Sequence, residues 1–324
     1  MIQDRITQIA LAKQTALSSP ASSGAYQIGV NSGSVATAEV SEDMLPITWA
    51  SRTGEGFDRA TITPGSSFET LAMPRSIGLL LKAALGTEQV TPGTPNVHTF
   101  TQAITAALPY LTIFARKSAE YYKVGDCAIS ELEITWEGTK AVVVKVTAMG
   151  CTYEFLAAPF TAAYDERPQC DDGVFKGAGG TFTVNGVAAV VEGGSIKISN
   201  NVEPVFGSNN LTPADVFPAM QQVDVSLNVV PNNLQDFRKV ITGQAAGTSL
   251  VPDPFFGTCV VKFLAKDVNT LTFNGNNVRW LTEFPDTNAE GGPVKITLEG
   301  STSQACGGGE PYSFVLENDE AAAY

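Results

Sequence analysis

A chain of 324 residues is long for one hydrophobic core and is consistent with about two domains. Its formal net charge of −13 would repel a phosphate backbone, which argues against nucleic-acid binding as its main activity. Hydrophobic residues make up 44% of the chain and charged residues only 16%, so the surface is either covered by uncharged polar groups or partly buried in an assembly.

The cysteines and the N-terminus indicate a protein made in a reducing compartment. The five cysteines are odd in number and share no CxxC spacing, so we expect reduced thiols rather than a disulfide framework. Asp4, Arg5 and Lys13 interrupt the first apolar stretch, unlike a secretory leader. No apolar run approaches the roughly 20 residues that a membrane span needs. The sequence therefore predicts a soluble protein with no membrane partner.

Short alternating runs, separated by 30 glycines and 18 prolines, predict a mainly β protein with frequent turns. In the first half we expect strands at 110–116, 131–137 and 141–150. In the second half we expect strands at 181–184, 195–199, 223–230, 259–265, 271–273 and 294–300.

Helix signals are few, and one stands out in each half. The first helix is expected to begin at Pro74 and to stop at Gly86, and the second to begin at Pro231 and to stop at Gly243. Each has an apolar stripe at helical spacing. The core candidates on these stripes are Leu80, Leu81, Leu85, Phe237 and Ile241.

The two halves share a pattern. The second helix follows the first at a constant offset of 157 residues, from Pro74 to Pro231 and from Gly86 to Gly243. The string VKVTAMG, which ends at Gly150, returns as VKITLEG at an offset of 150. A seven-residue difference in loop length is easily absorbed. We interpret this as a duplicated unit of strand, helix, several strands and closing strand, with chance similarity as the alternative.

These offsets divide the chain into segments. The two copies would span residues 28–155 and 181–302, with residues 156–180 between them as a linker or long loop rich in proline, glycine and charge. Residues 1–27 and 303–324 would form terminal arms.

No constellation of residues indicates catalysis, a metal or a cofactor. His98, the only histidine, has no acidic or cysteine neighbour in sequence and is expected to be a surface or half-buried side chain. The cysteines are too scattered for a zinc site. The glycine-rich stretches at 176–181 and 306–310 lack the context of a phosphate-binding loop. We therefore expect no catalytic residues and no enzyme activity.

One strand carries a conspicuous acidic face. In ELEITWE, Glu131, Glu133 and Glu137 point to one side while the residues between them are largely apolar. The simpler interpretation is a half-buried strand with a solvated face. The functional interpretation is a channel lining that repels passing DNA. Asp224 belongs to a similar, less charged pattern in the second half, which makes these four residues the candidate lumen-facing set.

Four longer segments, in this order, carry a family resemblance. They are IALAKQTALSSPASSGAYQIGV, MPRSIGLLLKAALGT, LPYLTIFARKSAEYYKVGDCAISELEITWEG and TPADVFPAMQQVDVSLNVVPNNLQDFRKVITG. The sequence resembles the major tail tube proteins of long-tailed bacteriophages, in the form with two tube domains per chain. Lys13-Gln14-Thr15-Ala16 departs from the Lys-Glu-Thr-Thr-Tyr-Gly that more often opens the family, which affects the placement of the N-terminal arm.

The resemblance implies a mainly β fold of two tandem, duplicated β-sandwich or partial-barrel domains, each with one flanking α-helix, and extended terminal arms. It implies rings of this chain stacked into a tube, whose acidic lumen conducts the DNA genome without specific binding. If a ring needs six tube domains, two per chain predict a trimer with pseudo-sixfold symmetry, and a hexamer is the alternative. The implied partners are the tail tip, tape measure and terminator proteins. The implied location is the virion tail, after assembly in the host cytoplasm.

Two other classes of protein compete with this interpretation. A capsid or decoration protein would also self-associate without an active site. A carbohydrate-binding or adhesive β-sandwich on a virion would expose aromatic side chains on loops. The aromatic residues Tyr110, Tyr121, Tyr122, Trp136 and Trp280 lie in or next to predicted strands, which favours packing over adhesion.

Overall fold

The computed structural model describes residues 6–44, 57–103, 107–167, 173–231, 238, 242, 255–266, 268–282, 294–304 and 308–324. Over these residues the protein is mainly β, as expected, and it has one α-helix, α1 (Ser76–Leu85). Nearly all of the helix predicted to start at Pro231, including Phe237 and Ile241, lies outside the described residues.

Helix α1 forms where the sequence predicts it and is enclosed by the strands around it. Every residue of the helix except Lys82 is buried, and Leu80, Leu81 and Leu85 are at most 1% exposed. A helix that is apolar on all sides is stable only inside a core. It ends at Gly86, whose φ of 89° suits glycine and whose N–H donates to the carbonyl of Lys82.

One sheet, here called the N-terminal sheet, lies wholly in the first half of the chain. Its order is β11–β2–β1–β7–β8–β10, and all neighbours are antiparallel except β11 and β2. Its strands are β1 (Ile6–Lys13), β2 (Gly24–Ile28), β7 (Leu111–Lys117), β8 (Glu120–Glu137), β10 (Thr152–Leu156) and β11 (Ala162–Asp165).

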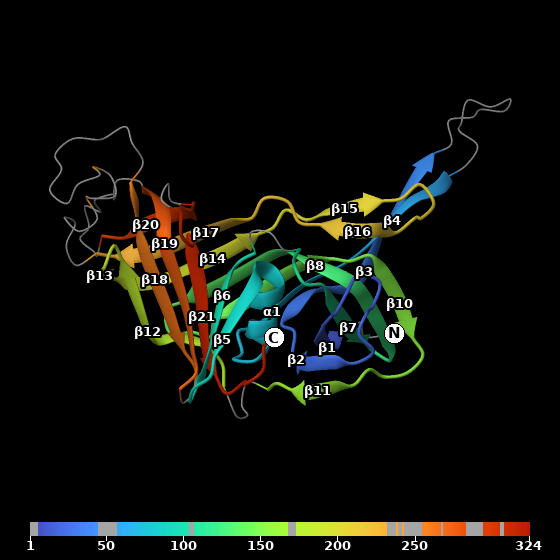
Figure 1. The fold of residues 1–324 in the computed structure, drawn as a ribbon, viewed down its shortest axis with the longest axis horizontal. Helices are drawn as coiled ribbons and strands as arrows, with labels where there is room; N and C mark the ends of the chain where they lie inside the picture. The colour runs from blue at the N-terminus through green and yellow to red at the C-terminus, as the bar shows by residue number, and fades with distance from the viewer. Residues whose placement is uncertain are drawn as a thin grey trace.

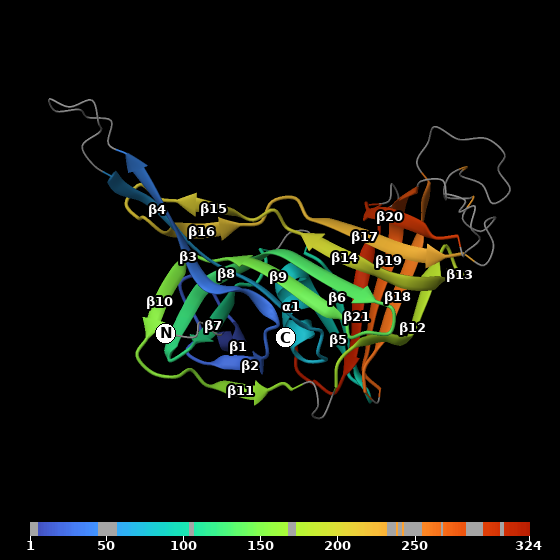
Figure 2. The same ribbon diagram turned by 180° about the vertical axis from the view of Figure 1, so that it is seen from behind.

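A second sheet, here called the continuous sheet, joins the two halves. Its order is β3–β4–β9–β8–β14–β17–β20–β19, antiparallel throughout. Its additional strands are β3 (Ser32–Met44), β4 (Phe57–Leu71), β9 (Val143–Met149), β14 (Val190–Ser199), β17 (Gln222–Val230), β19 (Thr270–Thr282) and β20 (Ile296–Thr302). Figures 1 and 2 show β14 and β17 running beside β8 from one half of the molecule into the other.

The first part of β19 continues into a further layer of strands in the second half. It pairs with β18 on one side and with β21 on the other, β18 pairs with β12, and β21 pairs with β6. The strands of this layer are β5 (Gly86–Thr91), β6 (Asn96–Gln102), β12 (Lys176–Val184), β13 (Val187–Ala188), β18 (Phe256–Leu264) and β21 (Tyr312–Asn318). Aromatic side chains, including Trp280, Phe273 and Phe314, fill the core beneath it.

Strand β8 belongs to both sheets of the first half, because it turns partway along its 18 residues. Asp126 has a φ of 54°, and the pairing with β9 shifts register between Ile129 and Glu131. A bulge of this kind bends a strand and increases its twist. The residues before the bend pair with β7 and β10, and the residues after it pair with β9 and β14.

Beyond the continuous sheet, β14 and β17 extend into a separate hairpin of β15 (Glu203–Phe206) and β16 (Pro213–Phe217). This hairpin lies over the first half of the chain (Figures 1 and 2). The N–H of Ile62 in β4 donates to the carbonyl of Leu211 at 2.8 Å, and the Tyr110 hydroxyl donates to Asp215 at 2.7 Å.

The segments expected to be terminal arms contain strands of these sheets, β1 near the N-terminus and β21 near the C-terminus. β1 pairs with β2 and β7, and β21 pairs with β19 and β6. The duplication and the domain limits 28–155 and 181–302 stay predictions.

Candidate functional site

The acidic strand predicted from the sequence forms the middle of the continuous sheet and has the expected two faces. Leu132, Ile134 and Trp136 point into the core and are 0, 1 and 5% exposed. Glu131 and Glu133 lie on the opposite face and are partly exposed. The alternation of β8 therefore assigns its carboxylates to one polar sheet face, which is the candidate site.

Charges of opposite sign alternate across this face. Cross-strand partners on neighbouring strands, from β4 to β19, form one row in which each residue is paired with the next. The row reads Glu69, Lys145, Glu133, Lys197, Asp224, Ser301 and Arg279. Opposite charges at directly opposed positions stabilise a sheet, whereas like charges there would destabilise it. The face therefore carries both signs of charge rather than acidic groups alone.

Lys197 of β14 is the cation at the centre of the candidate set. Its Nζ lies 2.8 Å from Oε2 of Glu131. The pKa of Lys197 is raised, chiefly by the hydrogen bond to Glu131 and further by the charges of Glu131, Glu133 and Asp224, against the opposing effect of desolvation. The structure thus brings three of the four candidate residues around one lysine. Sequence reasoning missed Lys197, although its alternation with Ile196 and Ile198 placed it on the polar face of its strand.

The fourth candidate, Glu137, lies at the end of β8 and does not join this cluster. Its carboxylate is 77% exposed and lies 2.7 Å from Nζ of Lys140. The hydrogen bond from Lys140 lowers the pKa of Glu137. Asp224 accepts hydrogen bonds from the Gln222 amide of its own strand and, at 2.5 Å, from the Ser301 hydroxyl of the neighbouring strand β20.

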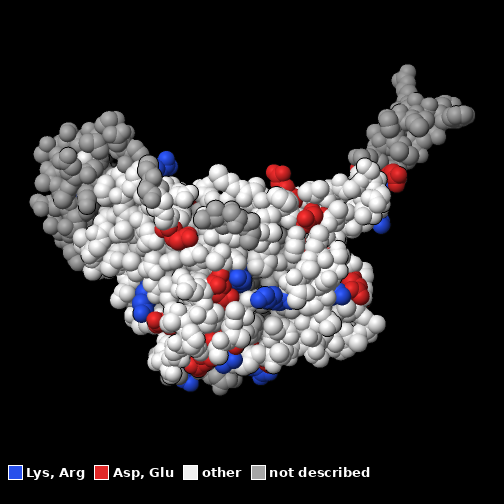
Figure 3. Space-filling model, in the orientation of Figure 1, with Lys and Arg blue, Asp and Glu red and all other residues white. Residues whose placement is uncertain are grey.

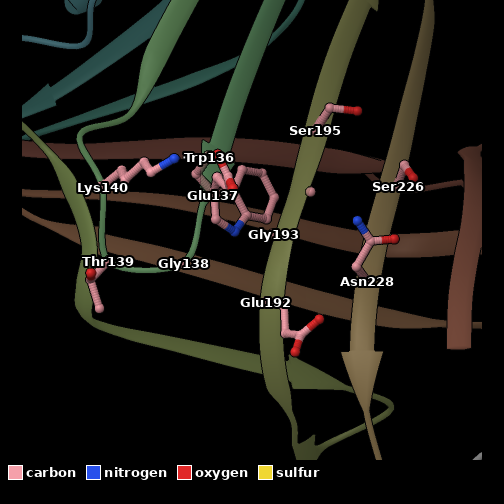
Figure 4. A pocket seen from close by; sticks show the side chains of 11 residues that line it. Trp136, Glu137, Gly138, Thr139, Lys140, Glu192, Gly193, Ser195, Ser226 and Asn228 are labelled. Atoms are coloured by element: carbon pink, nitrogen blue, oxygen red, sulfur yellow. Dashed lines mark hydrogen bonds and ion pairs between the residues drawn. The ribbon is translucent and has the colours of Figure 1, made fainter. Parts of the chain in front are cut away.

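A hollow of about 730 Å³ interrupts the polar face at the start of β14 (Figure 4). Gly193 lies opposite Glu137 on the polar face and has no side chain to fill the space there, whereas Gly194 lies opposite Trp136 on the core side. A Cβ on Gly194 would lie 2.7 Å from the Trp136 ring and 2.3 Å from the carbonyl oxygen of Ser226, which explains the glycine. Ser195, Ser226 and Asn228 complete a polar, open lining, and the hollow contains no paired nucleophile and base.

His98 is fully buried, so the prediction of a surface or half-buried histidine is wrong. Its Nδ1 lies 2.9 Å from Oε1 of Glu88, and its Nε2 lies 2.8 Å from the carbonyl oxygen of Glu320. Tyr324 packs over it, with the ring centroids 5.1 Å apart. The acidic neighbour comes from the adjacent strand β5, which sequence proximity alone does not indicate. These contacts enclose both ring nitrogens of His98.

The three cysteines that the structure describes are also enclosed. Cys127, Cys151 and Cys259 are free and buried, while Cys170 and Cys306 lie outside the described residues. Among the residues that the structure describes, no group of three or more His, Cys, Asp or Glu side chains could hold a metal ion.

None of the described helices is long and apolar enough to cross a membrane. On the face of the molecule shown in Figure 3, charged side chains are scattered among uncharged residues over the described part of the chain.

Comparison with known proteins identifies one family. A family model described as phage tail tube protein matches residues 5–301 of the chain. No curated protein sequence matches it. The family match covers both halves of the continuous sheet, from β3 to most of β20.

Proposed function

The chain belongs to the phage tail tube protein family, and on that premise we propose that its copies join side by side into rings that stack into a tube lined by the polar face of the continuous sheet. The family is structural, which makes the chain a component of the tail tube in the virion. Self-association into a tube follows from membership. The ring geometry and the channel lining are the proposal.

The junction between β8 and β14 supports side-by-side assembly. Residues 131–137 of β8 pair with residues 193–199 of β14, so the two halves are already joined edge to edge within one chain. The strand order β3–β4–β9–β8 in the first half corresponds to β14–β17–β20–β19 in the second. If the halves are duplicated, the same junction can repeat between chains.

The margins of the continuous sheet supply the edges for such a repeat. Among the described residues, β3 pairs only with β4, so its other edge has no strand partner. At the opposite margin lies the end of β19, where, among the described residues, β18 pairs with it as far as Arg279 and the N–H of Trp280 donates to the carbonyl of Phe255. Joining an edge of one chain to a different edge of the next is a heterologous contact, which closes into a ring when the rotation permits. Ring closure also removes the exposed edges.

If a ring needs six tube domains and each chain supplies two, a ring contains three chains and has pseudo-sixfold symmetry. We favour this arrangement over a ring of six chains. Each chain would then contribute two equivalent segments of the channel wall. We further propose contacts with tail tip, tape measure and terminator proteins at the tube ends and in its channel, and assembly in the host cytoplasm.

The pairing of charges on the polar face supports passage of DNA without binding. Lys145 and Lys197 each lie directly opposite Glu133 on a neighbouring strand, and Lys197 also contacts Glu131. A lysine held by carboxylates is less available to a phosphate group than an isolated one. The channel lining therefore combines cations that stabilise the sheet with carboxylates that repel the DNA backbone.

Electron microscopy of the concentrated, purified protein tests this proposal. We expect hollow tubes with three chains in each ring. Six chains per ring would replace the trimer by the hexamer. Closed shells or isolated particles at high concentration would contradict the tube and favour the capsid, decoration or adhesin-like alternatives.

The channel lining has a separate test. Changing Glu131, Glu133 and Glu137 to lysine should slow or trap DNA during ejection, because the lining would then attract phosphate groups. The changes at positions 131 and 133 also place like charges beside Lys145 and Lys197 and should lower the stability of the sheet, so ejection is compared in tubes that assemble. Ejection kinetics from phage carrying the variant provide the measurement. Unchanged kinetics would remove these residues from the lining.

A control variant with the same change in net charge separates this local effect from a general one. It carries lysine at three exposed acidic positions away from the polar face, Glu203, Glu310 and Asp319. Ejection from phage with the control variant should proceed at the wild-type rate.

A further inference from the structure

A cluster of aromatic side chains lies partly exposed at the margin of the N-terminal sheet. Phe155 of β10 is 69% exposed. Its ring centroid lies 5.2 Å from that of Tyr122 in β8 and 5.4 Å from that of Tyr153. We call Tyr122, Tyr153 and Phe155 the aromatic cluster. A phenylalanine left mostly in water at such a cluster marks an interaction surface more often than an isolated exposed residue does.

The aromatic cluster is directly connected to β3 of the continuous sheet. The Nζ of Lys117 lies 4.8 Å from the centroid of the Tyr122 ring and donates to the carbonyl of Ala36 in β3 at 2.9 Å. One lysine thus bridges the cluster and the strand whose other edge has no partner among the described residues. Figure 1 shows β10 at the end of the molecule from which the β3 and β4 hairpin extends.

A second open strand edge borders the aromatic cluster. Over the described part of the chain, β10 pairs only with β8, so its outer edge is unpaired like that of β3. Open strand edges are templates for pairing with another chain. Lys123 and Glu154, 2.5 Å apart on directly opposed positions of β8 and β10, form a charged pair on the opposite face of these strands from the rings. Aromatic side chains are enriched in protein interfaces, and here they lie beside an open strand edge.

We propose that the aromatic cluster, with the open edges of β3 and β10, is a surface on which a second copy of this chain docks in the assembled tube. The inference rests on the proposed function and adds the residues that anchor the contact. A second copy is the occupant because the family self-associates. The pairing of β8 with β14 within the chain is an example of the edge-to-edge contact that a second copy would make. The contact continues, at the free edge of β3, the side-by-side arrangement proposed for the ring.

A photo-crosslinking experiment tests the docking surface in the full chain. A benzoylphenylalanine residue replaces Phe155 in one variant and Val268 in a control, where Val268 is 53% exposed in the turn before β19. In assembled tubes, irradiation should give a covalent dimer of the chain from position 155 and none from position 268. Dilute, unassembled protein should give no dimer from either position. Tubes without a crosslink from position 155 would overturn the proposal.

Substitution provides a second measurement that depends on the same contact. Phe155→Asp should raise the lowest protein concentration that forms tubes by about tenfold or more, because a charged group would replace an interface anchor. The melting temperature of the unassembled chain should stay at the wild-type value, since Phe155 is mostly exposed. Val268→Asp, the matched control, should assemble like the wild type.

The outcomes separate this inference from the proposed function. Wild-type tubes together with normal assembly of Phe155→Asp would overturn the docking surface and leave the tube proposal in place. Absence of tubes from the wild-type chain at any concentration would overturn both. Crosslinks from position 155 to a protein other than this chain, in phage particles, would also overturn the second copy as occupant.

Discussion

The carboxylate of Glu166 accepts the backbone N–H of Ser76 at 2.9 Å and so caps helix α1 from 90 residues further along the chain. Its other oxygen accepts the N–H of Arg75 at 2.8 Å. The Arg75 side chain makes no capping hydrogen bond, and the first turn of the helix contains no acidic residue. Glu166, only 5% exposed, therefore satisfies two of the unpaired N–H groups and places a negative charge at the positive end of the helix dipole.

Glu166→Ala should lower the free energy of unfolding by about 2 to 3 kcal/mol, because two buried N–H groups lose a charged acceptor. Glu166→Gln keeps one carbonyl oxygen in place and should cost about half as much. Urea denaturation at pH 7 measures both. A Glu166→Gln variant as stable as the wild type would contradict a role for the second oxygen and for the charge.

Tyr324 occupies the space that a side chain on Gly78 would need. A Cβ on Gly78 would lie 2.2 Å from Cε2 of the tyrosine ring, so Gly78→Ala should destabilise the wild-type protein by about 1 to 3 kcal/mol through overpacking. Tyr324→Ala should cost about 3 kcal/mol or more through loss of a buried aromatic ring.

In the Tyr324→Ala background the sign of the Gly78→Ala effect should reverse. The clash is gone there, and alanine favours a helix interior over glycine by up to about 1 kcal/mol. A double-mutant cycle from thermal or urea unfolding gives the coupling between the two positions. Additive effects would show that the ring and the helix do not interact at this contact.

Removal of Lys197 should expose the repulsion among the carboxylates around it. Lys197→Met is expected to reduce the free energy of unfolding by about 0.5 to 1 kcal/mol at pH 7, a modest value because the pair with Glu131 is partly exposed. The loss should shrink near pH 3, where carboxyl groups are protonated and no longer need a cation. Lys140→Met, which breaks a more exposed pair, should leave the stability close to that of the wild type and serves as the control.

The buried thiols predict a loss of stability in alkali. Burial raises the pKa of Cys259 to about 12, whereas an unfolded thiol has a pKa of about 8.5. The stabilising contribution of the protonated thiol is therefore complete below pH 8.5 and is lost as the pH rises towards 12.

Between pH 9 and 11 the thiol of Cys259 should make the free energy of unfolding fall by up to about 1.4 kcal/mol per pH unit. Cys259→Ala should abolish this part of the decline. Thr258→Ala, an exposed neighbour, should leave the slope unchanged. Urea denaturation at a series of pH values tests this, and identical slopes for wild type and Cys259→Ala would refute it.

Local patterns in the sequence predicted the elements that depend on local interactions. The helix from Ser76 to Leu85 followed from a proline start, a glycine stop and an apolar stripe, because capping and periodicity act within a few residues. The faces of β8 followed from strict alternation, because successive side chains of a strand point to opposite sides. Leu132 and Glu131 therefore lie on the sides that the sequence assigns to them.

Contacts between distant segments had no such signal. His98 was expected to be a surface or half-buried side chain because it has no acidic or cysteine neighbour in sequence, yet β5 and the last residues of the chain enclose it beside Glu88. Lys197 was placed in a strand but not in the candidate site, because its proximity to Glu131 depends on the pairing of β14 with β8. The exposure of Phe155 likewise depends on strand pairing, because β10 pairs with β8 on one side and no described strand pairs with its other side.

The sequence by itself determined the mainly β character, helix α1, the family resemblance and the presence of an acidic strand face, because periodicity and turn residues act over short range. Only the tertiary structure decided that β8 pairs with β14, and that this pairing surrounds Lys197 with Glu131, Glu133 and Asp224. The choice of strand partners depends on backbone edges and core shape across the whole chain, and a backbone hydrogen bond carries no information about which sequence it will join.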